Sequence, residues 1–205
     1  MIKGINEMKD ELEQAVLKDL GRCPFFTEIG ELNGIKDYCE YFIEHVDEFS
    51  KDTSFDPPLL LAPNTNWIRW EPLGVCLVYG SWNYPYYVCL KPVVQAIATG
   101  NCACIKPSEM SPVSSAVMQK LVDKYLDNRC YRVLQGDVQV SIQIGTYPWD
   151  LICFTGSTEK GKLVAKAASA NLIPCILELG GKCPLIVDIG ADVDYAAYKC
   201  ASAKF

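Results

Sequence analysis

The chain has 205 residues, half of them hydrophobic, so it is long enough to bury a sizeable core as one large domain or two small ones. Its formal net charge of −6 argues against nucleic acid or an anionic membrane surface as a partner, since both attract basic proteins. No apolar run reaches the roughly 20 residues of a membrane helix, and residues 1–14 lack the apolar stretch of a secretory signal. We therefore expect a soluble, cytoplasmic protein.

The cysteine and histidine content excludes several kinds of site. The 11 cysteines are scattered without a C-x-x-C pair, which argues against a disulfide framework and against a zinc site. We expect most of them to be small buried hydrophobic residues. His45 is the only histidine and lies in an acidic helical pattern, so neither a Ser-His-Asp triad nor a His-rich metal site can be built.

The first part of the chain is predicted to be helical. Residues 7–49 show helical periodicity in two segments, and the Asn33-Gly34 pair is expected to break or bend the second. We assign residues 1–54 to an N-terminal helical segment. Residues 55–72 contain four prolines and no clear period, which predicts an extended connector.

From residue 73 onward, short apolar runs alternate with amphipathic segments. Strands separated by helices predict a parallel sheet that is covered by helices on both faces. The predicted fold class is therefore α/β, a doubly wound parallel sheet with N-terminal helices, and residues 73–205 form its α/β domain. The predicted strands are residues 75–79, 102–105, 131–134, 151–154, 175–179 and 185–187, and the predicted helices are residues 87–99, 113–126, 138–144, 160–170 and 193–203.

In an open parallel sheet, ligands bind beyond the carboxyl ends of the strands, so we examined the loops that follow the strands. Asn83, after the first strand, carries an amide that could donate to an oxyanion, although a turn asparagine beside a proline is the simpler interpretation of this loop alone. Lys106 and Glu109, after the second strand, flank a rigid proline. They suit the hydroxyl groups of a ribose, and a solvated strand end is the alternative.

Two further loops carry polar residues. Gly156, Ser157 and Gly161 join a strand to a helix, where free N–H groups suit a pyrophosphate. Their spacing matches neither G-x-G-x-x-G nor the Walker pattern, so a simple connector is equally compatible. Glu178 ends an apolar strand, where partial desolvation would raise its pKa and make it a general base. A salt-bridged strand terminus is the alternative.

Taken together, the ordered motifs W-N-Y-P, K-P-S-E, F-T-G-S-T-x-x-G and L-E-L-G-G-K resemble the aldehyde dehydrogenase superfamily. The flanking sequences EPLGVCLVYGSWNYP and AIATGNCACIKPSE resemble its class 3 or fatty-aldehyde branch. The resemblance runs from Glu11 to Phe205. It implies a Rossmann-like nucleotide-binding domain and, in the complete enzyme, NAD(P)+-dependent oxidation of an aldehyde to a carboxylic acid through a cysteine thiolate.

The resemblance also implies roles for individual residues. Asn83 would be the oxyanion-hole amide, and Glu178 would be the general base. The cofactor would be NAD or NADP, with NAD favoured because an acidic side chain suits free ribose hydroxyls. The cofactor contacts would be Lys106 and Glu109 at the adenosine ribose, with Gly156, Ser157 and Gly161 near the pyrophosphate.

The chain also departs from the family pattern. The family nucleophile lies in a G-Q-x-C segment farther beyond the glutamate than the 27 residues that follow Glu178 here. Neither Cys183 nor Cys200 stands in that context, and the catalytic domain is absent from residues 1–205. We therefore expect this chain alone to be inactive. A catalytically inactive nucleotide-binding module, or a scaffold subunit of a larger assembly, is the alternative.

A last expectation concerns partners. The predicted helix at residues 193–203 leads toward the second body of the family fold, so an apolar face on the order of 1,000 Å² should need a cover. We expect the remainder of the enzyme or other protein subunits to contact Tyr195, Tyr198 and Phe205. The alternative is that the two tyrosines pack onto their own sheet. Lys160 is a further departure, because the family commonly has an apolar residue there at the adenine pocket, although the long aliphatic stem of a lysine could still pack in that place.

Overall fold

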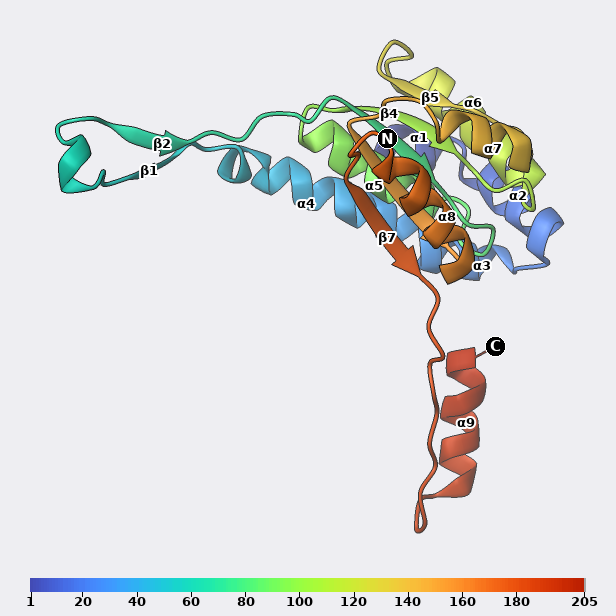
Figure 1. Cartoon of the computed structure of the whole chain (residues 1–205). Helices are drawn as coiled ribbons and strands as arrows, with labels where there is room; N and C mark the ends of the chain where they lie inside the picture. Colours follow the sequence, from blue (N-terminus) through green and yellow to red (C-terminus); the bar gives the residue numbers. More distant parts are fainter. Residues whose placement is uncertain (205) are drawn as a thin grey trace.

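The computed structural model describes residues 1–204, and its body is built on a five-stranded parallel sheet (Figure 1). The strand order is β5-β4-β3-β6-β7, so the chain winds outward from β3 in one direction and then crosses to the other side. The predicted doubly wound α/β fold is confirmed. The strands are β3 (Val75–Tyr79), β4 (Cys102–Lys106), β5 (Tyr131–Val133), β6 (Leu151–Gly156) and β7 (Cys175–Leu179).

Helices cover both faces of the sheet because alternate residues of each strand point to opposite sides. Cys76 and Ala103 belong to a core with α5, α6 and the N-terminal helices, whereas Leu77 and Ile152 belong to a second core with α7 and α8. Because both faces are covered, nearly every residue of a central strand is apolar, as expected for a parallel sheet. The helices are α5 (Tyr87–Ala98), α6 (Pro112–Tyr125), α7 (Val138–Ile144) and α8 (Thr158–Ser169).

The N-terminal helices share a core with the sheet and begin earlier than predicted, at Ile2. The predicted break at Asn33-Gly34 is not observed, because both residues are helical and the irregular part is a π-helical turn, η1, just before them. A Cβ atom at Gly34 would lie 2.9 Å from the ring of Tyr87, so this glycine allows the helix to pack closely on α5. The elements are α1 (Ile2–Glu7), α2 (Lys9–Leu20), α3 (Pro24–Thr27), η1 (Glu28–Leu32) and α4 (Asn33–Phe49).

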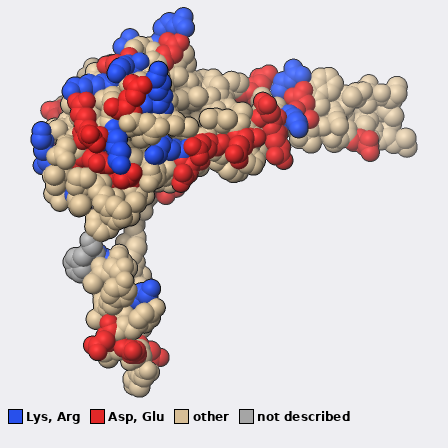
Figure 2. Space-filling view, turned by 180° about the vertical axis from the view of Figure 1, so that it is seen from behind, with Lys and Arg blue, Asp and Glu red and all other residues tan. Residues whose placement is uncertain are grey.

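The segment predicted as an extended connector contains a hairpin. Strand β1 (Thr53–Phe55) pairs antiparallel with β2 (Asn66–Ile68), and the 3-10 turn η2 (Leu59–Leu61) lies between them. The hairpin projects from the end of α4 as an arm, and pairing satisfies backbone groups that a single extended strand would leave to water (Figure 1). Acidic side chains gather on the part of this projection next to the body, which is α4, whereas the tip of the hairpin is nearly free of charge (Figure 2).

The last part of the chain stands away from the body (Figure 1). The strand predicted at residues 185–187 is not formed, because this segment has left the sheet and has no neighbouring strand to pair with. Helix α9 (Val193–Lys204) follows and has no buried residue. None of the helices in residues 1–204 has both the length and the apolar character that crossing a bilayer requires.

Candidate active site

The four loops predicted to carry function leave the sheet at one edge. Tyr79, the last residue of β3, is in register with Lys106 on one side and with Phe154 on the other. Thr155 is in register with Glu178 on the next strand. Since neighbouring strands lie about 4.8 Å apart, the four strand ends form one continuous row at the carboxyl edge.

The register also divides the candidate residues between the two faces of the sheet. Thr155 alternates with the residues that face α7 and α8, so Glu178 points to the face that α5 covers on the neighbouring strands. The loop of Asn83 leads directly into α5 and lies on this same face. Lys106 is in register with Tyr79, which packs in the core of α7 and α8. The predicted chemistry and the predicted cofactor contacts therefore lie on opposite sides of the strand ends.

The amide of Asn83 has a defined orientation. The hydroxyl of Ser81 donates to Oδ1 of Asn83 over 2.6 Å, and the backbone carbonyl of Asn83 accepts a hydrogen bond from Nη2 of Arg22. The residue itself is exposed just before α5. Because Oδ1 already has a donor, the NH2 group is the part of the amide that remains for a ligand, as an oxyanion would require.

The buried carboxylate of Glu31, which the sequence motifs do not mark, supports the same loop. Glu31 has no exposed surface, and its Oε2 accepts the backbone N–H groups of Tyr86 (2.8 Å) and Tyr87 (3.0 Å). Its Oε1 lies 2.6 Å from Nη1 of Arg22. Burial raises the pKa of Glu31, while the two N–H groups and the guanidinium act in the opposite direction. The start of α5 is thus capped by a side chain from η1.

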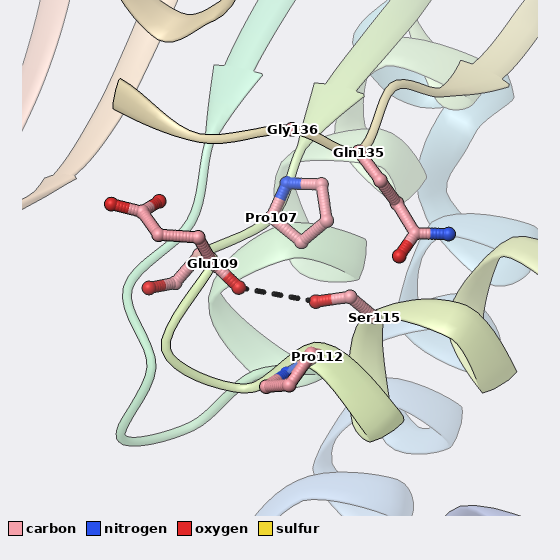
Figure 3. Close-up of a pocket in the computed structure, with 7 residues that line it drawn as sticks. Pro107, Glu109, Pro112, Ser115, Gln135 and Gly136 are labelled. Atoms are coloured by element: carbon pink, nitrogen blue, oxygen red, sulfur yellow. Dashed lines mark hydrogen bonds between the residues drawn. The ribbon is translucent and has the colours of Figure 1, made fainter. Parts of the chain in front are cut away.

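Glu109, which pairs with Lys106, lines a hollow of about 200 Å³ (Figure 3). The side chain of Lys106 is only 2% exposed, and its Nζ donates to the carbonyl oxygen of Pro107 (2.7 Å) and lies 3.5 Å from Oε2 of Glu109. The loop after β4, the start of α6 and the loop between β5 and α7 enclose the hollow. Its lining residues are Pro107, Ser108, Glu109, Pro112, Ser115, Gln135 and Gly136.

The glycine-rich loop ends in a capped helix. Ser157 is the N-cap of α8, and its hydroxyl accepts the N–H of Lys160 over 3.4 Å, which leaves the first N–H groups of the helix for an anion. Gly161 is buried one turn into the helix, and a Cβ there would lie 2.6 Å from Leu179. Gly161 therefore permits close packing of α8 on β7. Lys160 is exposed at the start of α8.

The structure does not bury Glu178. The residue is exposed on β7, the edge strand of the sheet, and neighbouring Ile176 on the same face is also exposed. Helices α5 and α6 cover this face only over the strands farther in, so nothing in residues 1–204 desolvates the carboxylate. Neither the predicted desolvation nor the alternative salt bridge is present within the described residues.

The remaining candidates concern the tail. Tyr195 and Tyr198 on α9 are 60% and 66% exposed, so the alternative in which they pack onto their own sheet is wrong. Phe205 lies outside the described residues. His45 lies on α4 and stacks on Tyr41, with ring centroids 4.4 Å apart.

The sheet order, the capped start of α8 and the hollow beside the strand ends are those of a doubly wound α/β domain with a site at its carboxyl edge. The profile of the aldehyde dehydrogenase family matches residues 1–205, and the chain belongs to this family. The resemblance to the class 3 branch is confirmed by relatives named aldehyde dehydrogenase family 3. One from Dictyostelium discoideum is 39% identical over 98% of this chain, and member I1 from Arabidopsis thaliana is 34% identical over 100% of it.

Solved structures agree with this assignment. A substrate-bound aldehyde dehydrogenase from Staphylococcus aureus has a TM-score of 0.94 and 33% identity over the whole chain. Betaine aldehyde dehydrogenase from the same species, in complex with NAD+, has a TM-score of 0.86 and 26% identity. The chain spans 44% and 40% of these two structures, and 43% and 38% of the D. discoideum and A. thaliana relatives.

Proposed function

We propose that this chain is the nucleotide-binding part of an NAD(P)+-dependent aldehyde dehydrogenase that oxidises an aldehyde to a carboxylic acid. The observation that carries the proposal is the division of the strand ends. At the carboxyl edge of the sheet, Asn83 and Glu178 lie on one face, whereas Lys106 and the start of α8 lie on the opposite face. The names of the relatives favour this enzymatic function over an inactive scaffold subunit.

The residues at the strand ends fit a dinucleotide. Lys106 and Glu109 would hold the adenosine ribose, and the start of α8 with Ser157 would hold the pyrophosphate. The carboxylate of Glu109 would repel an additional phosphate on that ribose, which favours NAD over NADP. When bound, the cofactor accepts the hydride that leaves the aldehyde carbon.

Two side chains of this chain would act on the substrate. The NH2 group of Asn83 would donate to the aldehyde oxygen as negative charge develops on it, and Glu178 would take a proton from the water that releases the acid. The exposure of Glu178 implies that the catalytic domain covers it in the complete protein. The cysteine nucleophile would also come from that domain, and the aldehyde would reach it from the face of α5.

The cofactor assignment predicts that Glu109→Ala weakens binding of NAD+ about tenfold, because a charge-assisted hydrogen bond contributes about 1.5 kcal/mol or more. Lys106→Met, which keeps the aliphatic stem of a buried side chain, should weaken it to a similar degree. Isothermal titration calorimetry of the chain with NAD+ measures both changes. Lys120→Ala, which removes an exposed ion pair with Glu11, is the matched control. Equal heats for all four proteins would remove the assigned site.

We also propose that the tail packs against the rest of the complete protein. Ile186, Ile189 and Val193 are each more than two-thirds exposed. Few monomeric proteins expose so many large apolar side chains in one segment, which favours a partner surface that covers them.

We propose the following division of the chain into domains. Residues 1–54 form a helical segment, residues 55–72 form a connector, and residues 73–205 form the nucleotide-binding domain.

This proposal predicts that the isolated chain self-associates, because association would bury apolar surface of the tail on the order of 1,000 Å². Replacing both Tyr195 and Tyr198 with serine should reduce the association, whereas Tyr147→Ser on the body should not. Light scattering combined with thermal unfolding measures the effect. A monodisperse monomer with a cooperative transition at ordinary temperature would show that no partner is required.

A further inference from the structure

We infer that Arg22 and Glu31 are positioning residues for catalysis, because together they fix the loop that carries the Asn83 amide. Together, the two residues form the Arg22–Glu31 clamp. The inference rests on the proposed function, in which this amide stabilises the oxyanion. It assigns a catalytic purpose to a buried ion pair that lies before the sheet in sequence and outside the four loop motifs.

Glu31 holds one end of the loop. Both of its carboxylate oxygens are used, Oε2 by the N–H groups of Tyr86 and Tyr87 and Oε1 by Arg22. These two N–H groups belong to the N-cap and the first residue of α5, immediately after the Asn83 loop. The carboxylate therefore fixes where the loop ends and the helix begins. Its position on a π-helical turn fits the frequent use of such turns at functional sites.

Arg22 holds the loop itself. Its guanidinium donates to Oε1 of Glu31 through Nη1 and to the backbone carbonyl of Asn83 through Nη2, and its carbon lies 4.4 Å from the ring centre of Tyr84. The planar fork of arginine can reach two acceptors and stack on a ring at once, which the single ammonium of lysine cannot do. Two of these contacts are made to Asn83 and to the next residue, Tyr84, and the third ties the guanidinium to Glu31.

Packing by itself does not hold this loop. Trp82, Asn83 and Tyr84 are all exposed, so no core contact fixes the amide. An oxyanion donor must be held within about 0.5 Å of its productive position. The hydrogen bonds of Glu31 stabilise the start of α5, but stability alone does not require an ion pair here, because replacing a buried ion pair with apolar residues is often neutral or stabilising. Control of the loop geometry is the further consequence of the bond from Arg22 to the carbonyl of Asn83.

The first test measures the loop in the 205-residue chain by amide hydrogen exchange and mass spectrometry. Arg22→Lys keeps a charge opposite Glu31 but loses the bond to Asn83, so exchange across residues 81–87 should become about tenfold faster. Arg129→Lys, which alters an exposed ion pair with Asp127, is the matched control and should leave this segment unchanged. Unchanged exchange in Arg22→Lys would overturn the clamp.

The second test measures catalysis in the complete protein that contains this chain. Arg22→Lys should lower kcat about tenfold, with the affinity for NAD+ and the midpoint of thermal unfolding nearly unchanged, because only the transition state uses the placed amide. Glu31→Gln keeps an oxygen for the N–H groups of α5 and should lose less activity than Glu31→Ala. A fall in kcat that merely follows the loss of folded protein would contradict a positioning role. A complete protein that shows no turnover at all would instead refute the proposed function and, with it, the catalytic purpose of the clamp, even where the exchange result supports its geometry.

Discussion

The 205-residue chain, incubated alone with NAD+ and a medium-chain aldehyde, is expected to form no NADH above a buffer blank. The proposed mechanism needs a thiolate beside the Asn83 amide, and removing the nucleophile of a covalent mechanism typically costs several orders of magnitude in rate. Burial raises the pKa of the Cys89 thiol to about 12 and that of Cys153 to about 11, so these cysteines stay protonated at neutral pH. Production of NADH can be followed by absorbance.

Three cysteines are the ones to replace if NADH does appear. Cys23 and Cys183 are exposed, and Cys200 is half-buried on α9. Cys23 follows Arg22, which contacts the Asn83 loop, whereas the other two lie in the tail beyond β7. A rate above the blank would contradict the prediction. Loss of that rate in Cys23→Ser, Cys183→Ser or Cys200→Ser would then identify the thiol that acts.

In the complete protein, Asn83→Ala is expected to lower kcat by about 100- to 1000-fold, which is the usual cost of removing one oxyanion-hole donor. Asn83 is exposed, and its side chain is bonded only to the neighbouring Ser81, so the free energy of unfolding should change by no more than about 0.5 kcal/mol. Affinity for NAD+ should stay as it is, because the proposed cofactor contacts lie on the other face of the strand ends.

Steady-state kinetics, calorimetry and thermal unfolding of Asn83→Ala separate these effects. Asn64→Ala, which changes an exposed asparagine on the hairpin arm, is the matched control and should behave as the unchanged protein. A kcat that falls by less than about tenfold in Asn83→Ala would remove the amide from the oxyanion hole. A parallel loss of NAD+ affinity would show that the loop serves the cofactor instead.

Much of the fold was predictable because the sheet is buried on both faces. Its strands are short apolar runs separated by amphipathic helices, and residues 138–144 and 175–179 have the predicted bounds. The place of the site was predictable for a related reason, since parallel strands bring the loops that follow them to one edge. The roles assigned to the residues in these loops came from family motifs and remain proposals.

The misses arise where tertiary contacts decide. Glu31 lies four residues before Ile35 and eight before Cys39, on the face of the helix that faces the core, and an acidic residue there was the available signal for a buried polar site. Nothing local connects it with Arg22 or with the start of α5. The exposure of Glu178 also depends on which strand forms the edge of the sheet, which the motif does not reveal.

Formation of NADH by the complete protein decides whether this chain supplies the nucleotide-binding part of an aldehyde dehydrogenase. With NAD+ and a medium-chain aldehyde, we expect steady NADH production together with stoichiometric carboxylic acid, and loss of nearly all of that rate in Asn83→Ala. The absence of both products under conditions where calorimetry shows bound NAD+ would refute the proposed function and favour an inactive nucleotide-binding subunit.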